Sequence, residues 1–190
     1  IGILACDNDI IISHDADVLL PISQLIKSLD LIKKSPFCFP YSSGLINIPR
    51  EKVSEIRTAQ DSHNIFPKLV PKIQANPDGG CFVFQKKEFI KAGMENESFV
   101  NYNLEDAERK TRLQILGYDI KYVDGYIYHL EHSKSVMSTW QNQFYKGGRQ
   151  LYDSIKNMQQ DDMRKYVESF TWTKRKLEDL DHSIFVPSDI

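Results

Sequence analysis

Cysteine, an excess of positive charge and long apolar runs are all lacking in this 190-residue sequence. Its three cysteines, Cys6, Cys38 and Cys81, contain no Cys-x-x-Cys pair, so neither a disulfide framework nor a thiolate zinc site is expected. We predict that they are small core residues. A formal net charge of -2 provides no basic surface for a phosphate backbone, so we expect no nucleic-acid partner. No apolar run approaches the roughly 20 residues of a membrane-spanning helix, so we expect no membrane span.

A targeting signal and an initial methionine are also missing. The chain starts at Ile1, and no charged start leads into an apolar stretch, so we predict no secretory signal and expect a fragment or processed piece. The rest of the composition is ordinary. Apolar residues make up 41% and charged residues 26%, which is typical of one globular domain with a substantial core.

Strand-like and helix-like segments alternate along the chain, which predicts an α/β fold with a mixed sheet flanked by helices. We predict, in order, a strand buried on both faces at 10–13, a helix over 21–34, a strand after Gly79 and Gly80 followed by a helical turn ending at Gly93, and a helix between Asn103 and Gly117. In that last helix Asn103 is the expected N-cap, and the expected apolar face is Leu104, Ala107, Leu113 and Leu116. Strand material follows up to a histidine pair. The chain then becomes polar and helical, with Gly147 and Gly148 expected to interrupt a helix.

The first candidate for chemistry is the acidic pair Asp15 and Asp17. The Asp-x-Asp spacing also occurs at 7–9 and 179–181, so the spacing alone carries little information. Only Asp15 and Asp17 follow a run of β-branched residues, at the place where open α/β sheets put their ligands. One interpretation is an acidic turn after a strand. The other is a carboxylate site for Mg²⁺ or Mn²⁺.

The second candidate is the pair His129 and His132. On a strand, residues three apart point to opposite faces, so both could bind one ion only if the segment turns there. Imidazole combined with carboxylate favours Mn²⁺ over Mg²⁺. Surface or core histidines with no ligand are the alternative.

The third candidate is Glu105 and Asp106, near the start of the helix between Asn103 and Gly117. Asp106 at position N3 fits a capping box with Asn103, which requires no function. A carboxylate held at a helix start is also suited to act as a general base. Gly79 and Gly80 have two interpretations as well, since paired glycines serve a tight turn or allow close approach of a ligand.

Taken in order, four segments resemble one family: HDADVLLP, GGCFVFQKKEFIKAGMENESF, NLEDAERKTRLQILGYDI and YHLEH. They resemble the catalytic half of GT-A glycosyltransferases of the β-1,4-galactosyltransferase type, including related bacterial polysaccharide polymerases and polypeptide N-acetylgalactosaminyltransferases. The resemblance covers about residues 1–133. It implies a GT-A catalytic portion over 1–134 and a helical C-terminal extension over 135–190.

The resemblance also implies roles for individual residues. Asp17 would bind Mn²⁺ (or Mg²⁺) together with His132 and His129, and Asp15 would lie near the donor ribose or its phosphate. Asp106 would take the proton of the acceptor hydroxyl while Glu105 grips the sugar. Gly79 and Gly80 would line the donor pocket, and Tyr102 would serve as a sugar platform.

The implied activity is metal-dependent, inverting transfer of a hexose or N-acetylhexosamine from a UDP-sugar donor to a glycan acceptor. A bacterial cytoplasmic enzyme of polysaccharide biosynthesis fits the absence of disulfides and signals. The family has glycines before its acidic pair that this chain lacks, and its nucleotide-recognition half precedes the Asp-x-Asp motif, so that half is expected to be missing. Two alternatives stay open, a non-catalytic carbohydrate-binding or interaction domain and another metal-dependent enzyme such as a phosphoryl hydrolase.

Overall fold

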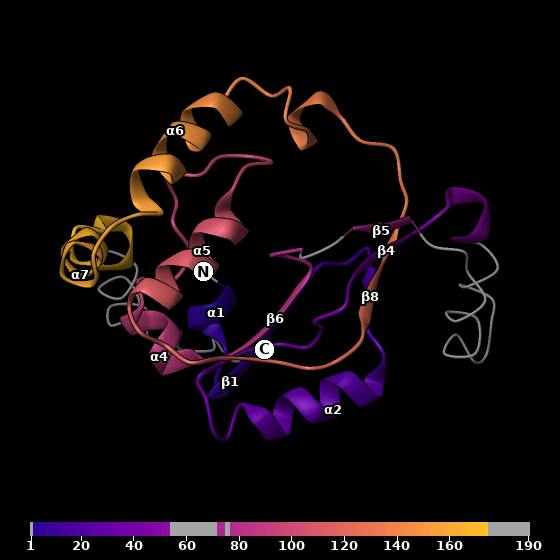
Figure 1. Ribbon diagram of the computed structural model, residues 1–190, viewed down its shortest axis with the longest axis horizontal. Helices are drawn as coiled ribbons and strands as arrows, with labels where there is room; N and C mark the ends of the chain where they lie inside the picture. Colours follow the sequence, from indigo (N-terminus) through magenta and orange to yellow (C-terminus); the bar gives the residue numbers. More distant parts are fainter. Residues whose placement is uncertain (1, 54–71, 75–76, 175–190) are drawn as a thin grey trace, which may run out of the picture.

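The computed structural model describes residues 2–53, 72–74 and 77–174, which form a mixed α/β fold with two mixed sheets flanked by helices (Figure 1). The predicted α/β class is therefore confirmed. The first sheet has the order β1-β6-β3-β7, formed by Ile10–His14, Cys81–Gln85, Phe37–Phe39 and Ile120–Tyr122. The second has the order β2-β8-β4-β5, formed by Val18–Leu19, Tyr126–Leu130, Gly44–Ile48 and Lys72–Gln74.

The chain passes from the first sheet to the second at three places. It does so between β1 and β2, between β3 and β4, and between β7 and β8. Each sheet contains one parallel pair, β3 with β7 and β4 with β8, beside antiparallel pairs. The Asp15 and Asp17 turn is the first of these crossings, and the histidine pair begins at the end of β8, so the topology places both at the second sheet.

Helices cover the sheets on two sides (Figure 1). Their bounds are Gly2–Ala5 (α1), Ile22–Leu31 (α2), Lys86–Lys91 (α4), Glu105–Ile115 (α5), Tyr145–Ile155 (α6) and Gln160–Glu168 (α7), with a 3-10 turn at Val136–Ser138 (η3). Figure 1 shows α5, α6 and α7 grouped together, while the chain after β8 arches through η3 to reach α6. Both α6 and α7 pack against α5, so the C-terminal helices support the helix that carries Glu105 and Asp106.

The core has two layers on either face of the first sheet. Strand alternation puts Phe37, Phe39, Phe82 and Phe84 on one face, where they are buried under α4 and α5 and pack with Phe89 of α4. Cys38 and Val83 point to the other face and pack against α2 through Ile32 and its neighbouring leucines. Aromatic burial of this size is the main source of the stability that holds the site in place.

Strand β1 lies at the edge of its described sheet and is buried on one face only, so the prediction of a strand buried on both faces was wrong. Ile11 is buried, whereas Ile10 and Ile12 are 37% and 41% exposed. The reason is that α2 packs over β3 and β7 and leaves the β1 end of the sheet uncovered. Among the cysteines, Cys38 and Cys81 are core residues as predicted, but Cys6 is exposed.

Helix α5 departs from its prediction at its start and on its buried face. It begins at Glu105 with Leu104 as N-cap, so Asp106 is at N2 and Asn103 makes no capping bond to the helix interior. Leu113 is buried as expected, but most of the buried face is charged: Glu108, Arg109 and Arg112. Arg112 and Glu108 form a fully buried pair, and Arg112 also donates to the carbonyls of Ala92 and Met94.

Glycines end two helices as predicted, but the glycine pair expected to interrupt a third helix does not do so. Gly93 and Gly117 follow α4 and α5 with φ of 92° and 87°, a conformation that glycine adopts without strain. Helix α2 ends at Leu31, three residues short of the prediction. Gly147 and Gly148 do not interrupt α6 but lie inside it.

Candidate functional site

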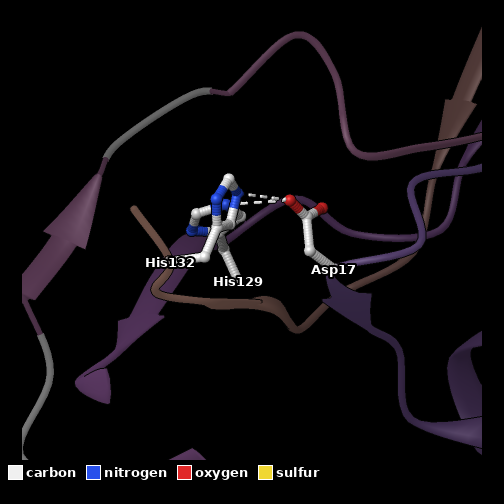
Figure 2. Close-up of side chains that lie close together, drawn as sticks. All are labelled: Asp17, His129 and His132. Carbon is white, nitrogen blue, oxygen red and sulfur yellow. Dashed lines mark hydrogen bonds and ion pairs between the residues drawn. The ribbon is translucent and has the colours of Figure 1, made fainter. Parts of the chain in front are cut away.

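Asp17, His129 and His132 gather where β2 pairs with the end of β8. Val18 pairs with His129 in the antiparallel register, and the Leu130 amide donates to the Asp17 carbonyl at 2.8 Å. Strand β8 ends at Leu130, and the chain turns before His132, which meets the condition under which both imidazoles can reach one point. Figure 2 shows the two imidazoles facing the Asp17 carboxylate from one side.

The distances within this cluster would allow its three side chains to bind one ion. His132 Nε2 lies 2.8 Å and His129 Nε2 lies 3.5 Å from Asp17 Oδ2. One ligand atom from each of the three residues lies within 4.8 Å of the others. Adjacent ligands at about 2.1 Å from an octahedral ion lie about 3 Å apart, so these separations are close to what a divalent cation needs.

The Nδ1 atom of each histidine has a hydrogen-bond partner of its own, which leaves the Nε2 atom facing Asp17. His129 Nδ1 lies 3.0 Å from Asn47 Oδ1, and His132 Nδ1 lies 2.9 Å from the Ser133 carbonyl. With each Nδ1 donating to an oxygen, each Nε2 faces Asp17, and both Nε2 atoms could bind a cation through their lone pairs once that cation replaces their present contacts with the carboxylate. One carboxylate and two imidazoles suit Mn²⁺ better than Mg²⁺. The residues therefore fit a metal centre.

A cavity of about 410 Å³ adjoins this cluster and extends to Glu105 and Asp106 of α5. Its lining includes most of the residues that the sequence singled out: Asp15, Gly79, Gly80, Tyr102, Glu105, Asp106 and His129. Asp17 and His132 do not line the cavity themselves but reach it through their contact with His129. The carboxylates of α5 and His129 of the candidate metal cluster thus line one cavity.

The absence of a side chain at Gly79 gives the Asp106 carboxylate its place in the cavity. A Cβ on Gly79 would lie 1.9 Å from Asp106 Oδ2, so only a glycine allows the carboxylate to take this position. The loop is fixed from two sides, because the Tyr41 hydroxyl donates to the Gly79 carbonyl at 2.6 Å and Lys110 bonds Asp78 at 2.8 Å. Gly80 has a φ of 94°, so it also occupies a backbone conformation that favours glycine.

Three carboxylates that line the cavity have a pKa above the usual carboxyl value and are harder to ionise than ordinary ones. Burial raises the pKa of Asp106 above its usual value, although the nearby Arg109 guanidinium acts in the opposite direction. Burial also raises the pKa of Glu105, whose Oε2 is buried with no hydrogen-bond partner in the described part of the chain. The pKa of Asp15 is raised by burial and by repulsion from Asp106 and Asp17. Asp106, whose pKa is shifted as in acid-base groups, therefore lies beside Glu105 Oε2, an oxygen that can accept a hydrogen bond from a ligand.

Tyr102 forms an aromatic wall at the mouth of the cavity. Its ring is stacked on Tyr145 of α6, with centroids 6.3 Å apart and planes 17° from parallel. The Tyr102 carbonyl accepts a hydrogen bond from Asn142, which ties this wall to the segment before α6. An exposed aromatic face beside polar groups is suited to one face of a sugar ring.

Sequence reasoning missed four residues that support the site: Tyr41, Asn47, Arg109 and Lys134. Lys134 lines the cavity two residues beyond His132, a place where a cation can meet an anionic ligand. Its position after the histidine pair was a usable signal. Tyr41 and Asn47 act through partners distant in sequence, so nothing local could have identified them. Arg109 lies three residues after Asp106 on the same helix, a spacing typical of an ion pair and therefore also a usable signal.

A second cavity, of about 630 Å³, lies elsewhere. It is lined by residues of α2, of the turn after it and of the segment from β7 to β8, among them Lys27, Lys33 and Tyr122, and by none of the predicted site residues. Lys33 is already paired with Asp30. We therefore assign the chemistry to the smaller cavity.

Gly148 of α6 fixes the loop before the acidic pair, and this predicts a stability difference between two neighbouring glycines. A Cβ on Gly148 would lie 1.9 Å from Asn103 Oδ1. The Asn103 amide bonds the carbonyls of Val100 and Phe144, so it cannot move without breaking the loop. We expect Gly148→Ala to lower the free energy of unfolding by about 1–3 kcal/mol, the usual cost of overpacking. Urea denaturation measures it.

Gly147→Ala is the matched control. A Cβ on Gly147 meets nothing within 4 Å, so the substitution changes only the helix preference. We expect it to raise the free energy of unfolding by up to about 1 kcal/mol. Equal effects of the two substitutions would contradict the assigned role of Gly148.

Comparison with known proteins gives no family: neither a protein-family model nor a curated protein sequence matches the chain. Across the part of the chain that the structure describes, no helix combines the length and apolar character needed to cross a membrane. The site's own geometry therefore carries the functional argument.

Proposed function

We propose that this chain is the catalytic portion of a GT-A-type, metal-dependent inverting glycosyltransferase. It transfers a hexose or N-acetylhexosamine from a UDP-sugar to a glycan acceptor. The observation that carries the proposal is one cavity lined both by His129 of the carboxylate-histidine cluster and by the half-buried carboxylates Glu105 and Asp106. This is the separation of roles that inverting transfer requires.

The donor side is formed by Asp17, His129 and His132, with Asp15 and Lys134 nearby. A bound Mn²⁺ would offset the negative charge that develops on the leaving diphosphate. Asp17 and the histidine Nε2 atoms would hold it, and their outer partners keep the imidazoles oriented. Glu105 Oε2, buried and unpartnered among the described residues, is placed to accept a hydrogen bond from a sugar hydroxyl.

The acceptor side is formed by Asp106 and Tyr102. The acceptor hydroxyl oxygen attacks the anomeric carbon as the bond from that carbon to the diphosphate oxygen breaks, and UDP leaves with the electron pair. The hydroxyl proton passes to Asp106. Because attack comes from the face opposite the leaving group, the configuration at the anomeric carbon inverts.

Calorimetric titration of the 190-residue chain with UDP, with and without Mn²⁺, tests the donor side. We expect UDP binding to require Mn²⁺ and to be lost in His132→Ala. Even outer partners of metal ligands are worth about 10–100-fold in affinity, so we expect losing His132 to weaken Mn²⁺ binding by more than about 100-fold. Titration followed by the electron paramagnetic resonance signal of free Mn²⁺ measures that affinity directly.

His14→Ala is the control, since His14 is an exposed histidine outside the cluster. It is expected to keep Mn²⁺ and UDP binding. Product analysis with a panel of UDP-hexoses and UDP-N-acetylhexosamines then tests transfer. Glycan binding that needs neither Mn²⁺ nor UDP, without transfer, would instead support a non-catalytic carbohydrate-binding domain.

A further inference from the structure

Arg109 is buried directly behind Asp106, and its contacts define one orientation for that carboxylate. The Arg109 side chain is 8% exposed. One terminal nitrogen donates to Asp106 Oδ1 at 2.5 Å, and the other donates to Glu95 Oε1 at 2.9 Å. The guanidinium also lies over the buried Phe82 ring, 5.1 Å from its centroid. These contacts fix the guanidinium on three sides.

The same contacts leave the second oxygen of Asp106 for the cavity. Oδ1 is taken by Arg109, whereas Oδ2 faces Gly79, where the absence of a side chain leaves room. Asp106 and Gly79 both line the cavity. A proton acceptor must point at the hydroxyl it deprotonates, so orientation of Oδ2 is as important as charge.

From this geometry we propose that Arg109 is the positioning residue of the transfer reaction, holding Asp106 ionised with Oδ2 aimed at the acceptor, and that Glu95 opposes it. The inference rests on the proposed function, in which Asp106 is the base. Arg109 itself does not touch the substrate.

The charges around Asp106 make the pKa of its carboxyl group sensitive to Arg109. The ionisable groups that face Asp106 from the surrounding elements are Arg109 and Glu105 of α5, Glu95 after α4, Asp78 before β6, Asp15 after β1 and Tyr41 after β3. All of them except Arg109 are acidic or neutral. Burial raises the pKa of Asp106, Arg109 lowers it, and Glu95 raises it again.

Two substitutions should therefore move the acidic limb of the pH-rate profile in opposite directions. The base acts only when deprotonated, so activity is lost as the pH falls through the pKa of Asp106. Removing the positive charge in Arg109→Met raises that pKa, and we expect the limb to move up by about 1–3 pH units. Removing the negative charge in Glu95→Gln lowers it, and we expect a downward shift of less than about one unit.

Arg109→Lys separates charge from geometry. Lysine keeps the positive charge, so we expect the limb to stay closer to that of the wild type than in Arg109→Met. It cannot contact Asp106 and Glu95 with one planar group, so we expect kcat to remain about 10-fold or more below the wild type while KM changes little. Glu95→Gln and Arg109→Lys preserve most of the packing and give a result even if Arg109→Met does not fold.

The carboxyl carbon shift of Asp106, followed by NMR during a pH titration, gives the same pKa without turnover. Opposite movement of that pKa in Arg109→Met and Glu95→Gln, matched by the kinetic limb, is the expected result. Limbs that stay in place, or move in the same direction, would overturn the role of Arg109. If the wild type transfers no sugar at all, the proposed function has failed, and with it the positioning role, whatever the NMR titration gives.

Discussion

Asp106→Asn is expected to lower kcat by about 10³-fold or more while Mn²⁺ and UDP still bind. A positioned general base contributes about 10²–10⁴-fold, and an amide cannot take the acceptor proton. Asparagine keeps the shape and an oxygen that can still accept from Arg109, so the buried guanidinium retains its partner. Steady-state kinetics with saturating donor, alongside calorimetry with UDP, measures both quantities.

Glu105→Gln is the comparison for that variant, because it lies one residue away and lines the same cavity. Its expected role is to hold the sugar, so we expect KM to rise more than kcat falls. Asp106→Ala is a poorer test, since it leaves a buried positive charge without one of its two partners. Wild-type kcat in Asp106→Asn would show that another group takes the proton.

The acid limb of the wild-type profile follows from the same burial. Because burial raises the pKa of Asp106, transfer is expected to fall at a pH above the usual carboxyl range as the solution is acidified. This is the reference against which the Arg109 and Glu95 variants move.

Local sequence signals were sufficient for several elements of this fold. The glycines after α4 and α5, the apolar spacing of α2 and the short apolar strands depend on residues close in sequence, and the structure places each near its predicted position. Element ends were less accurate, as in α2, because the last turn depends on what packs against it.

Burial could not be predicted in the same way, because it depends on strand order and on distant partners. The sequence around Ile11 reads as a fully buried strand, yet its exposure is set by where α2 packs on the sheet. In α5 the pattern Glu-Asp-x-Glu-Arg resembles a solvated helix face. Glu108 and Arg112 are buried only because Arg112 has backbone carbonyls of Ala92 and Met94 to bind.

The candidate site was predictable to the extent that its residues occur in recognisable pairs. The family resemblance groups Asp17 with the two histidines, which follow it by 112 and 115 residues, and the structure brings one ligand atom of each within 4.8 Å of the others. Their orientation was not predictable. It depends on Asn47 and on the β2–β8 register, which arise only when the second sheet forms.

Asp17→Asn is expected to have the second large effect, loss of metal-dependent transfer. The Asp17 carboxylate is the point at which both Nε2 atoms converge, so replacing it removes the charged ligand from the cluster. A metal that stabilises the leaving group is worth several kcal/mol, and losing about 4 kcal/mol corresponds to about 10³-fold in rate. We expect kcat/KM to fall by at least this factor and Mn²⁺ affinity by more than about 100-fold.

Asp9→Asn is the matched control, because the sequence contains the same Asp-x-Asp spacing at Asp7 and Asp9. Both of these residues are exposed, and neither belongs to the histidine cluster or the cavity lining. Asp9→Asn should therefore keep full activity and Mn²⁺ binding. Equal losses in the two variants would mean that net acidity, and not the geometry around Asp17, attracts the cation. A loss confined to Asp17→Asn would tie metal binding to the one Asp-x-Asp pair that the fold brings beside two imidazoles.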